Sequence, residues 1–299
     1  MTDTILVTGA TGFTGRHTVP ILVESGFKVR CIVRPQSNVR PLKALGVELV
    51  VGDLSRPESL AKVFAGVSGL VSIAPLDTGY ADVVVEAAVA NGIERAVFVS
   101  STSIFTRLNA ETKVIRLAAE RRIAESGLWY TIIRPTMIYG STGDRNISRL
   151  IRYLQRWPVL FIPGPGTFLV QPIYVDDVAR AIVDAYRRPK AVGRSYNIAG
   201  REPLTFNRLV DTVCTFLGKK RIKLHLPAAP IINVFQRAEA AGLNLFLRAE
   251  QIERLNEDKA FGYEEAARDF GFASLRFEEG VKREIAMMGI FKRSTDVLA

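Results

Sequence analysis

The chain has 299 residues, of which 48% are hydrophobic and 23% are charged, and its formal net charge at pH 7 is +10. This composition excludes a disordered chain and is typical of a globular protein with a large core. The basic residues are spread along the sequence without a long run, so no nucleic-acid-binding tail is expected, and the positive charge favours anionic ligands or surfaces.

Cysteine and histidine are rare. Cys31 and Cys214 lie far apart in apolar stretches, which predicts buried free thiols in a reducing compartment and therefore a cytoplasmic location. His17 and His225 are the two histidines, so no metal site is expected. No signal peptide or run of roughly 20 apolar residues is recognised. Contact with a membrane surface stays open, as does the choice between a monomer and a homodimer.

The first 140 residues alternate between short β-branched runs and helical patterns. The runs predict strands at 4–8, 28–33, 47–51, 69–74, 95–100 and 129–133. The intervening patterns predict helices at 13–25, 57–65, 79–91 and 112–126. Strict alternation implies right-handed crossovers and a parallel sheet that is covered by helices on both faces.

After residue 140 this rhythm breaks. The segments 141–146 and 163–168 are rich in turn formers, a helix at 175–187 and a strand at 195–199 return to the sheet, and a strand candidate at 221–226 interrupts a mostly helical remainder. We therefore predict an α/β fold with a doubly wound parallel sheet (Rossmann), formed by residues 1–140 plus 173–199. A smaller, mostly helical C-terminal lobe, formed by 141–172 plus 200–299, is expected to bind a small-molecule substrate.

Three glycines lie between the first predicted strand and the first predicted helix, in the segment TILVTGATGFTGRH. Gly9 permits a tight turn, Gly12 lets a pyrophosphate approach the backbone, and Gly15 lets helix and strand pack closely. The N-terminus of the helix offers free N–H groups to the phosphates. This spacing, in this context, predicts a dinucleotide site.

The end of the second strand indicates which dinucleotide is bound. A carboxylate there would bond the ribose 2′-hydroxyl of NAD(H), but the segment CIVRPQSN offers Arg34 instead. A guanidinium suits a 2′-phosphate. We therefore expect NADP(H) to be preferred, with NAD(H) as the alternative, and Arg16 is a possible helper. The other interpretation of Arg34 is a solvated residue at a strand end.

These motifs resemble the extended and atypical short-chain dehydrogenase/reductase superfamily, an NAD-dependent epimerase/dehydratase-like group with redox-sensor and complex I-associated relatives. The resemblance covers nearly the whole chain and is carried by TGATGFTG, GDLSRPESL, VSIAP, FVSSTSIF, YTIIRPTMIYG and IYVDDVARAI. It implies an NAD(P)(H)-binding oxidoreductase. The cofactor contacts that it implies, beyond the glycines, are Thr11 and Phe13 in the loop, Asp53 and Leu54 at the adenine, Ala74 beside the riboses and Pro135 near the nicotinamide.

The resemblance fails at one point of the catalytic site. Active members use a strand-end serine, which maps to Ser101, and a Tyr-x-x-x-Lys pair on the following helix. Counted from Lys113 the tyrosine position is Asn109, and counted from Arg116, the favoured register, it is Thr112. Neither residue is an acid at physiological pH.

Three outcomes follow from the missing tyrosine. Tyr139 or Tyr80 could replace the phenol, although core packing is the simpler role for both. Solvent could supply the proton. Alternatively, the protein could bind NADPH without turnover, as a redox sensor or respiratory-complex assembly factor does. A nucleotide-sugar epimerase or dehydratase is a third interpretation, although those reactions depend most on the tyrosine.

The sequence says less about the substrate than about the cofactor. Arg145, with Arg149 and Arg152, could clamp an anionic substrate or simply form a basic solvent-exposed face. Gln171 stands where the resemblance implies a substrate contact. The apolar segment 227–255 fits a pair of core helices over the cleft, or else a lid or interfacial helix that admits a lipophilic, quinone-like substrate.

Overall fold

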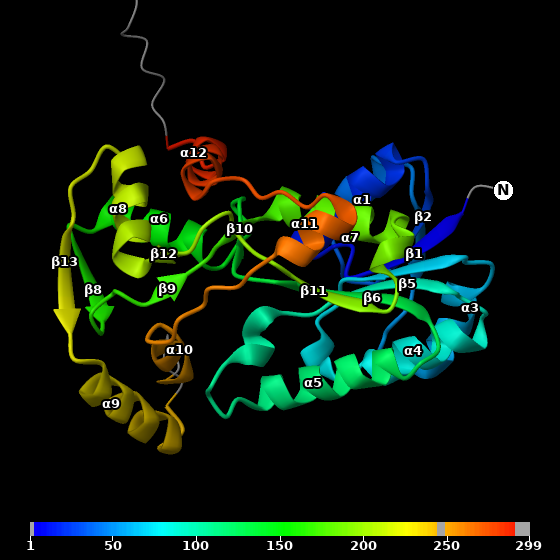
Figure 1. Cartoon of the computed structure of the whole chain (residues 1–299), viewed down its shortest axis with the longest axis horizontal. Coiled ribbons are helices and arrows are strands. Elements are labelled where there is room, and N and C mark those ends of the chain that lie inside the picture. Colours follow the sequence, from blue (N-terminus) through cyan, green and yellow to red (C-terminus); the bar gives the residue numbers. More distant parts are fainter. Residues whose placement is uncertain (1–2, 244–248, 291–299) are drawn as a thin grey trace, which may run out of the picture.

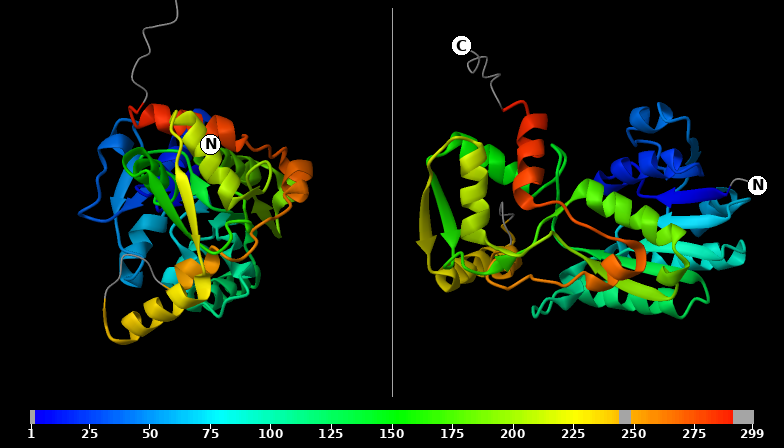
Figure 2. Two further views of the ribbon diagram at one scale, coloured as in Figure 1. Left: turned by 90° about the vertical axis from the view of Figure 1, so that its left-hand side faces the viewer. Right: turned by 45° about the horizontal axis from the view of Figure 1, so that its top comes forward.

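The computed structural model of the chain describes residues 3–243 and 249–290. A sheet flanked by helices occupies one end of the molecule, and a lobe of helices and short strands occupies the other (Figure 1). Two further views show the same division of the elements (Figure 2). Part of the apolar segment 227–255, residues 244–248, lies outside the described residues.

Seven strands of the described chain form one parallel sheet, in the order β11-β6-β5-β4-β1-β2-β3. Their bounds are β1 Thr4–Thr8, β2 Lys28–Val33, β3 Glu48–Val51, β4 Gly69–Ser72, β5 Arg95–Val99, β6 Trp129–Pro135 and β11 Arg194–Ile198. The strand order reverses between β1 and β4, and open α/β sheets bind ligands at such a point, outside the carboxyl ends of the strands. The predicted doubly wound parallel sheet is confirmed.

Helices cover both faces of this sheet (Figure 1). One face packs on α1 (Phe13–Glu24), α2 (Arg40–Lys43), α7 (Val175–Arg187) and α11 (Glu264–Phe270). The other face packs on α3 (Leu60–Phe64), α4 (Ala81–Ala90) and α5 (Glu111–Ala124). The central strands are buried on both sides, which explains their continuous β-branched sequences. Cys31, in β2, and Cys214, in the lobe, are buried free thiols, as predicted.

The lobe contains more strands than expected. Its helices are α6 (Ile147–Arg156), α8 (Phe206–Phe216), α9 (Ala228–Ala240), α10 (Ala249–Arg254) and α12 (Phe277–Met287). Three two-stranded sheets join β7 (Ile138–Tyr139) to β10 (Ile173–Tyr174), β9 (Leu169–Val170) to β12 (Leu204–Thr205), and β8 (Val159–Pro163) to β13 (Ile222–Leu226). Most of these strands have two residues, which is too short for a period to be visible in the sequence.

The helix α9 corrects one expectation for the lobe. None of its residues is buried, so it does not belong to a core helix pair. The lobe has its own buried cluster, to which α6, α8 and α12 contribute. Among the described helices, none combines the length and the apolar character that a membrane-spanning segment requires.

Candidate functional site

The glycine loop between β1 and α1 is tightly packed on one side and open on the other. Gly9 has a φ of +69°, and a Cβ there would lie 2.7 Å from the backbone nitrogen of Ala74. A Cβ on Gly15 would lie 2.3 Å from the carbonyl oxygen of Gly9. A Cβ on Gly12 would meet that oxygen alone, at 3.1 Å. Gly9 and Gly15 therefore hold the loop against β4 and α1, whereas Gly12 leaves a free backbone surface.

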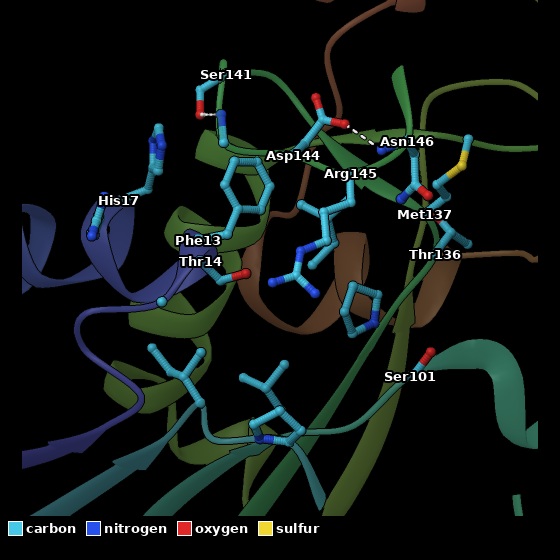
Figure 3. Close-up of a pocket in the computed structure, with 18 of the residues that line it drawn as sticks. Phe13, Thr14, His17, Ser101, Thr136, Met137, Ser141, Asp144, Arg145 and Asn146 are labelled. Carbon is cyan, nitrogen blue, oxygen red and sulfur yellow. Dashed lines mark hydrogen bonds between the residues drawn. The ribbon is translucent and has the colours of Figure 1, made fainter. Parts of the chain in front are cut away.

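A cavity of about 800 Å³ opens above this loop, at the carboxyl end of the sheet. The N-terminal turn of α1 contributes Phe13, Thr14 and His17, and α1 has no side-chain cap to occupy its free N–H groups. The remaining walls come from the segments after β4, β5 and β6, from α5, and from the loop 141–146. Figure 3 shows the side chains of Phe13, Thr14, Arg145 and Thr136 around this space.

The residues of this cavity fit a dinucleotide. An uncapped helix N-terminus favours a diphosphate, and three guanidinium groups, those of Arg16, Arg116 and Arg145, line the same space. The buried hydroxyl of Ser100 also lines the cavity, and its Oγ has no hydrogen-bond partner among the described residues. A bound polar ligand would satisfy this atom, because buried hydroxyl groups rarely stay unpaired.

His17 and Asp176 form a hydrogen-bonded pair at the edge of this cavity. Nδ1 of His17 lies 2.6 Å from the Asp176 carboxylate, and this hydrogen bond holds the pKa of Asp176 below its usual value. Asp176 belongs to the VDDVA motif at the start of α7. The sequence analysis recognised the motif without assigning this contact, which joins the first helix to a segment 159 residues further along the chain.

The predicted adenosine contacts lie at the ends of β2 and β3, outside the lining of this cavity. Arg34 is exposed directly after β2, so its guanidinium is accessible to a phosphate. The Asp53 carboxylate accepts hydrogen bonds from the backbone and hydroxyl of Ser55, which lower its pKa. Leu54 packs against the buried cluster on one face of the sheet. The structure therefore places these residues together at the carboxyl ends of β2 and β3.

A second cavity, of about 270 Å³, adjoins the first. Ser101, Thr136, Met137 and Asn146 line both. The other walls of the second cavity come from the turn after Ser101, from the end of β9 and from the lobe segment 254–261. They include Phe105, Val170, Leu255, Lys259 and Phe261. Rossmann domain and lobe thus enclose a small, partly apolar chamber that reaches the larger cavity at Ser101.

The residues of the two possible Tyr/Lys registers have different surroundings on α5. Arg116 lines the larger cavity, where its guanidinium bonds Ser103 Oγ at 2.6 Å and Asp77 Oδ2 at 2.5 Å. Thr112, one turn earlier, is among the lining residues of neither cavity. Lys113 donates from Nζ to the carbonyl of Thr106 at 2.7 Å, an ordinary loop contact. Arg116 therefore lies at the larger cavity, whereas Thr112 and Lys113 do not line it.

The structure does not support Tyr139 as a replacement phenol. Its side chain is fully buried, and its hydroxyl group donates to the carbonyl of Phe277 at 3.4 Å. Burial raises its pKa well above the usual value. The ring packs against Tyr174 and Phe277 beneath α12. Tyr139 is thus a core residue of the lobe.

The two predicted substrate residues have different surroundings. Arg145 extends from the loop 141–146 toward the middle of the larger cavity (Figure 3). Gln171 lines the second cavity, but its amide already accepts from the backbone N–H of Phe261 at 2.8 Å and donates to the carbonyl of Gly200 at 2.7 Å. Gln171 therefore holds two lobe segments together beside the smaller chamber, whereas Arg145 is available to a ligand in the larger cavity.

The fold and the two joined cavities define a dinucleotide-binding protein of the Rossmann type. A family model described as NAD(P)H-binding matches residues 9–189, more than half of the chain. The chain therefore belongs to this NAD(P)H-binding family, within the atypical short-chain dehydrogenases/reductases, as the sequence motifs predicted.

Three curated relatives illustrate the range of this family. The ceramide reductase of Caulobacter vibrioides is 32% identical over 77% of this chain and 75% of its own. The 2-alkyl-3-oxoalkanoate reductase of Stenotrophomonas maltophilia is 28% identical over 93% and 97%. The photosystem II assembly factor Ycf39 of Trieres chinensis is 25% identical over 74% and 71%. Reductases and an assembly factor thus share this sequence pattern.

Solved structures show the same fold. The crystal structure of gox2253 superposes with a TM-score of 0.80 at 24% identity, over 96% of this chain and 98% of that one. MoeE5 in complex with UDP-glucose and NAD superposes with a TM-score of 0.75 at 24% identity, over 96% and 98%. At this level of identity the likeness concerns the architecture alone.

Proposed function

We propose that this protein is an NADP(H)-dependent reductase of a small, partly apolar carbonyl compound. The observation that carries the proposal is the position of Ser101, which lies where a cavity suited to a dinucleotide meets a smaller chamber. A bound reduced nicotinamide supplies hydride in this family of reactions. One relative is a 2-alkyl-3-oxoalkanoate reductase, and the oxo group in the name of its substrate supports the same chemistry here.

The local geometry supports a role for each proposed cofactor contact. The free N–H groups of α1 and the open backbone at Gly12 hold the diphosphate. Arg34 binds the 2′-phosphate, and its exposure at the end of β2 supports this role. Arg116, fixed by Asp77 and Ser103, orients the nicotinamide half. In this proposal residues 1–140 plus 173–199 hold the cofactor, residues 141–172 plus 200–299 hold the substrate, and the protein acts in the cytoplasm.

Lys259 is our candidate for the missing acid. It lines the second cavity together with Ser101, and its ammonium group donates to the carbonyl of Arg254, which leaves further protons free for a ligand. Burial lowers the pKa of Lys259, and a lowered pKa makes an ammonium group a better proton donor near neutral pH. Ser101 would then hold the reacting oxygen while Lys259 protonates it.

The direct test is turnover with a panel of quinones, aldehydes, enones and 3-oxo compounds, followed by the absorbance of NADPH. We expect at least one compound to be reduced, and Ser101→Ala to lower kcat by on the order of a hundredfold, because it removes the hydrogen bond to the developing charge. The binding of NADPH should be nearly unchanged in this variant. Turnover that is equal in Ser101→Ala and the unmodified protein would contradict the assignment.

A second function has support from the same helix. Thr112 replaces the tyrosine and faces neither cavity, and one relative is a photosystem II assembly factor. A non-catalytic NADPH-binding regulator or assembly factor needs the cofactor cavity without the acid. Tight NADPH binding, with an absorbance trace that stays flat across the whole panel, would favour this function over the reductase.

A further inference from the structure

The two-stranded sheet of β8 and β13 presents an exposed apolar face. Strand β8 pairs with β13 so that Phe161 lies opposite Leu224. The alternate residues of β8, Leu160 and Ile162, are buried in the lobe core. Successive side chains of a strand point to opposite faces, so Phe161 points away from this core. Phe161, Leu224 and Ile222 are 55%, 45% and 65% exposed.

The helix α9 adds one apolar side chain to this surface. The partly buried residues Ile231, Ile232 and Phe235 mark the inner side of α9, and Gln236 and Glu239 bond the neighbouring helix α10 from its border. With 100° per residue, the outer side presents Pro230, Asn233 and Arg237, with Val234 beside them. Val234 is 63% exposed. The exposed side of α9 is thus mostly polar, as in an ordinary amphipathic helix, and Val234 is its one large exposed apolar side chain among residues 228–240.

These residues form one region, which we call the end face: Trp157, Phe161, Ile222, Leu224 and Val234. The strands β8 and β13 and the helix α9 lie together at the end of the molecule away from the seven-stranded sheet (Figures 1 and 2). Trp157, which precedes β8, is 51% exposed, with the guanidinium of Arg156 5.7 Å from its ring centre. Tryptophan and arginine in this arrangement are common where a protein meets the polar headgroups of a bilayer.

The charge around the end face is mostly positive, although Lys223 is paired with Asp211. The segments 155–163 and 217–243 contain six basic residues, Arg156, Lys219, Lys220, Arg221, Lys223 and Arg237, and one acidic residue, Glu239. The carboxylate of Glu239 already accepts a backbone hydrogen bond from α10. Lys219 and Lys220 are exposed beside β13. An apolar patch with a basic rim is complementary to an anionic lipid surface.

We propose that the end face docks this protein on the surface of an anionic membrane, with the exposed side chains of β8 and β13 and Val234 of α9 turned toward the headgroups. A second copy of the chain is a poorer occupant, because two end faces that each carry this excess of positive charge would repel one another. The docking is independent of the proposed reductase activity, since the glycine loop and both cavities lie in other parts of the chain.

The experiment is vesicle sedimentation of the full chain without cofactor. The vesicles contain either phosphatidylcholine alone or phosphatidylcholine and phosphatidylglycerol in equal amounts. We expect binding to the anionic vesicles that weakens as salt is added. Val234→Glu should lower the partition coefficient about tenfold, because it removes a valine that the membrane would bury and adds a negative charge that the anionic lipids repel. Val89→Glu, at a 48% exposed position on α4, is the matched control and should bind like the unmodified protein.

A spectroscopic signal tests the orientation. The chain has two tryptophans, so in a Trp129→Phe background the emission of Trp157 reports the end face alone. A shift of this emission to shorter wavelength with anionic vesicles supports the proposal. Absence of binding to anionic vesicles, or equal loss of binding in the Val234→Glu and Val89→Glu variants, overturns it. A dimer in sedimentation velocity that Val234→Glu dissociates would also overturn it, by assigning the end face to a second copy.

Discussion

A buried carboxyl group on α12 should make the stability of this protein depend on pH. Glu284 is fully buried, and neither of its oxygens has a partner of ordinary hydrogen-bond geometry among the described residues. Burial and the adjacent carboxyl group of Asp144 raise the pKa of Glu284 from 4.5 to about 10, against the opposing influence of Arg152 and the backbone of Gly140. Asp144 itself lines the larger cavity.

The sign of the effect follows from proton binding. Between pH 4.5 and about 10 the folded protein holds a proton on Glu284 that the unfolded chain has released. The contribution of Glu284 to the stability is therefore fully present below pH 4.5, and this contribution declines as the pH rises toward the folded-state pKa. Each pH unit in this window lowers the free energy of unfolding by about 1.4 kcal/mol. At pH 7 the loss amounts to about 3 kcal/mol.

The perturbation is Glu284→Gln, which keeps the shape of the side chain and cannot ionise. Urea unfolding of both proteins at several values between pH 5 and pH 8 gives the free energy of unfolding at each pH. We expect the free energy of unfolding of the variant, relative to that of the unmodified protein, to rise by about 1.4 kcal/mol for each pH unit in this range. Glu279→Gln, at an exposed position of the same helix, is the control and should change little. A difference between Glu284→Gln and the unmodified protein that is constant over this range would refute the reasoning.

Three further predictions concern the cofactor and the acid. Gly12→Ala should weaken NADPH binding with little change in Tm. Gly15→Ala, whose Cβ would lie 2.3 Å from a backbone oxygen, should weaken binding and also lower the free energy of unfolding by about 1–3 kcal/mol. Calorimetry measures the binding and thermal unfolding the stability, and equal Tm values for the two variants would contradict the packing account. Arg34→Ala should lower the NADPH/NADH affinity ratio at least tenfold, and an unchanged ratio would exclude this residue as the 2′-phosphate contact. Lys259→Met should abolish the decline of kcat with rising pH, because an ammonium donor must be protonated; an identical pH profile would exclude it.

The sequence predicted the parallel sheet well and the lobe less well. The strands β1, β2 and β5 are continuous β-branched runs because both of their faces are buried, and such runs are visible without any structure. Strands such as β7 and β9 have two residues each, and their pairing depends on segments far apart in the chain. The apolar sequence of α9 suggested a core helix, since composition alone does not indicate whether a neighbour covers it.

The candidate site was predictable where a backbone motif defines it. The spacing of the three glycines identified the phosphate loop, because each glycine answers a local steric demand. The joining of two cavities at Ser101, and the approach of Lys259 to that point, depend on the lobe folding back over the sheet. Asp144 and Glu284 are separated by 140 residues in the sequence, and the sequence analysis assigned no role to either. Their contact is a tertiary property that no local pattern contains.

The sharing of walls between the two cavities limits how such a protein can change. Thr136 and Met137 border both spaces, so a bulkier side chain at either position would narrow the nucleotide chamber and its neighbour together. New selectivity for one ligand would therefore alter affinity for the other. Positions that face a single space, such as Leu255 in the roof of the smaller chamber, are the ones where an engineer, or natural variation, could reshape recognition and leave the nucleotide undisturbed.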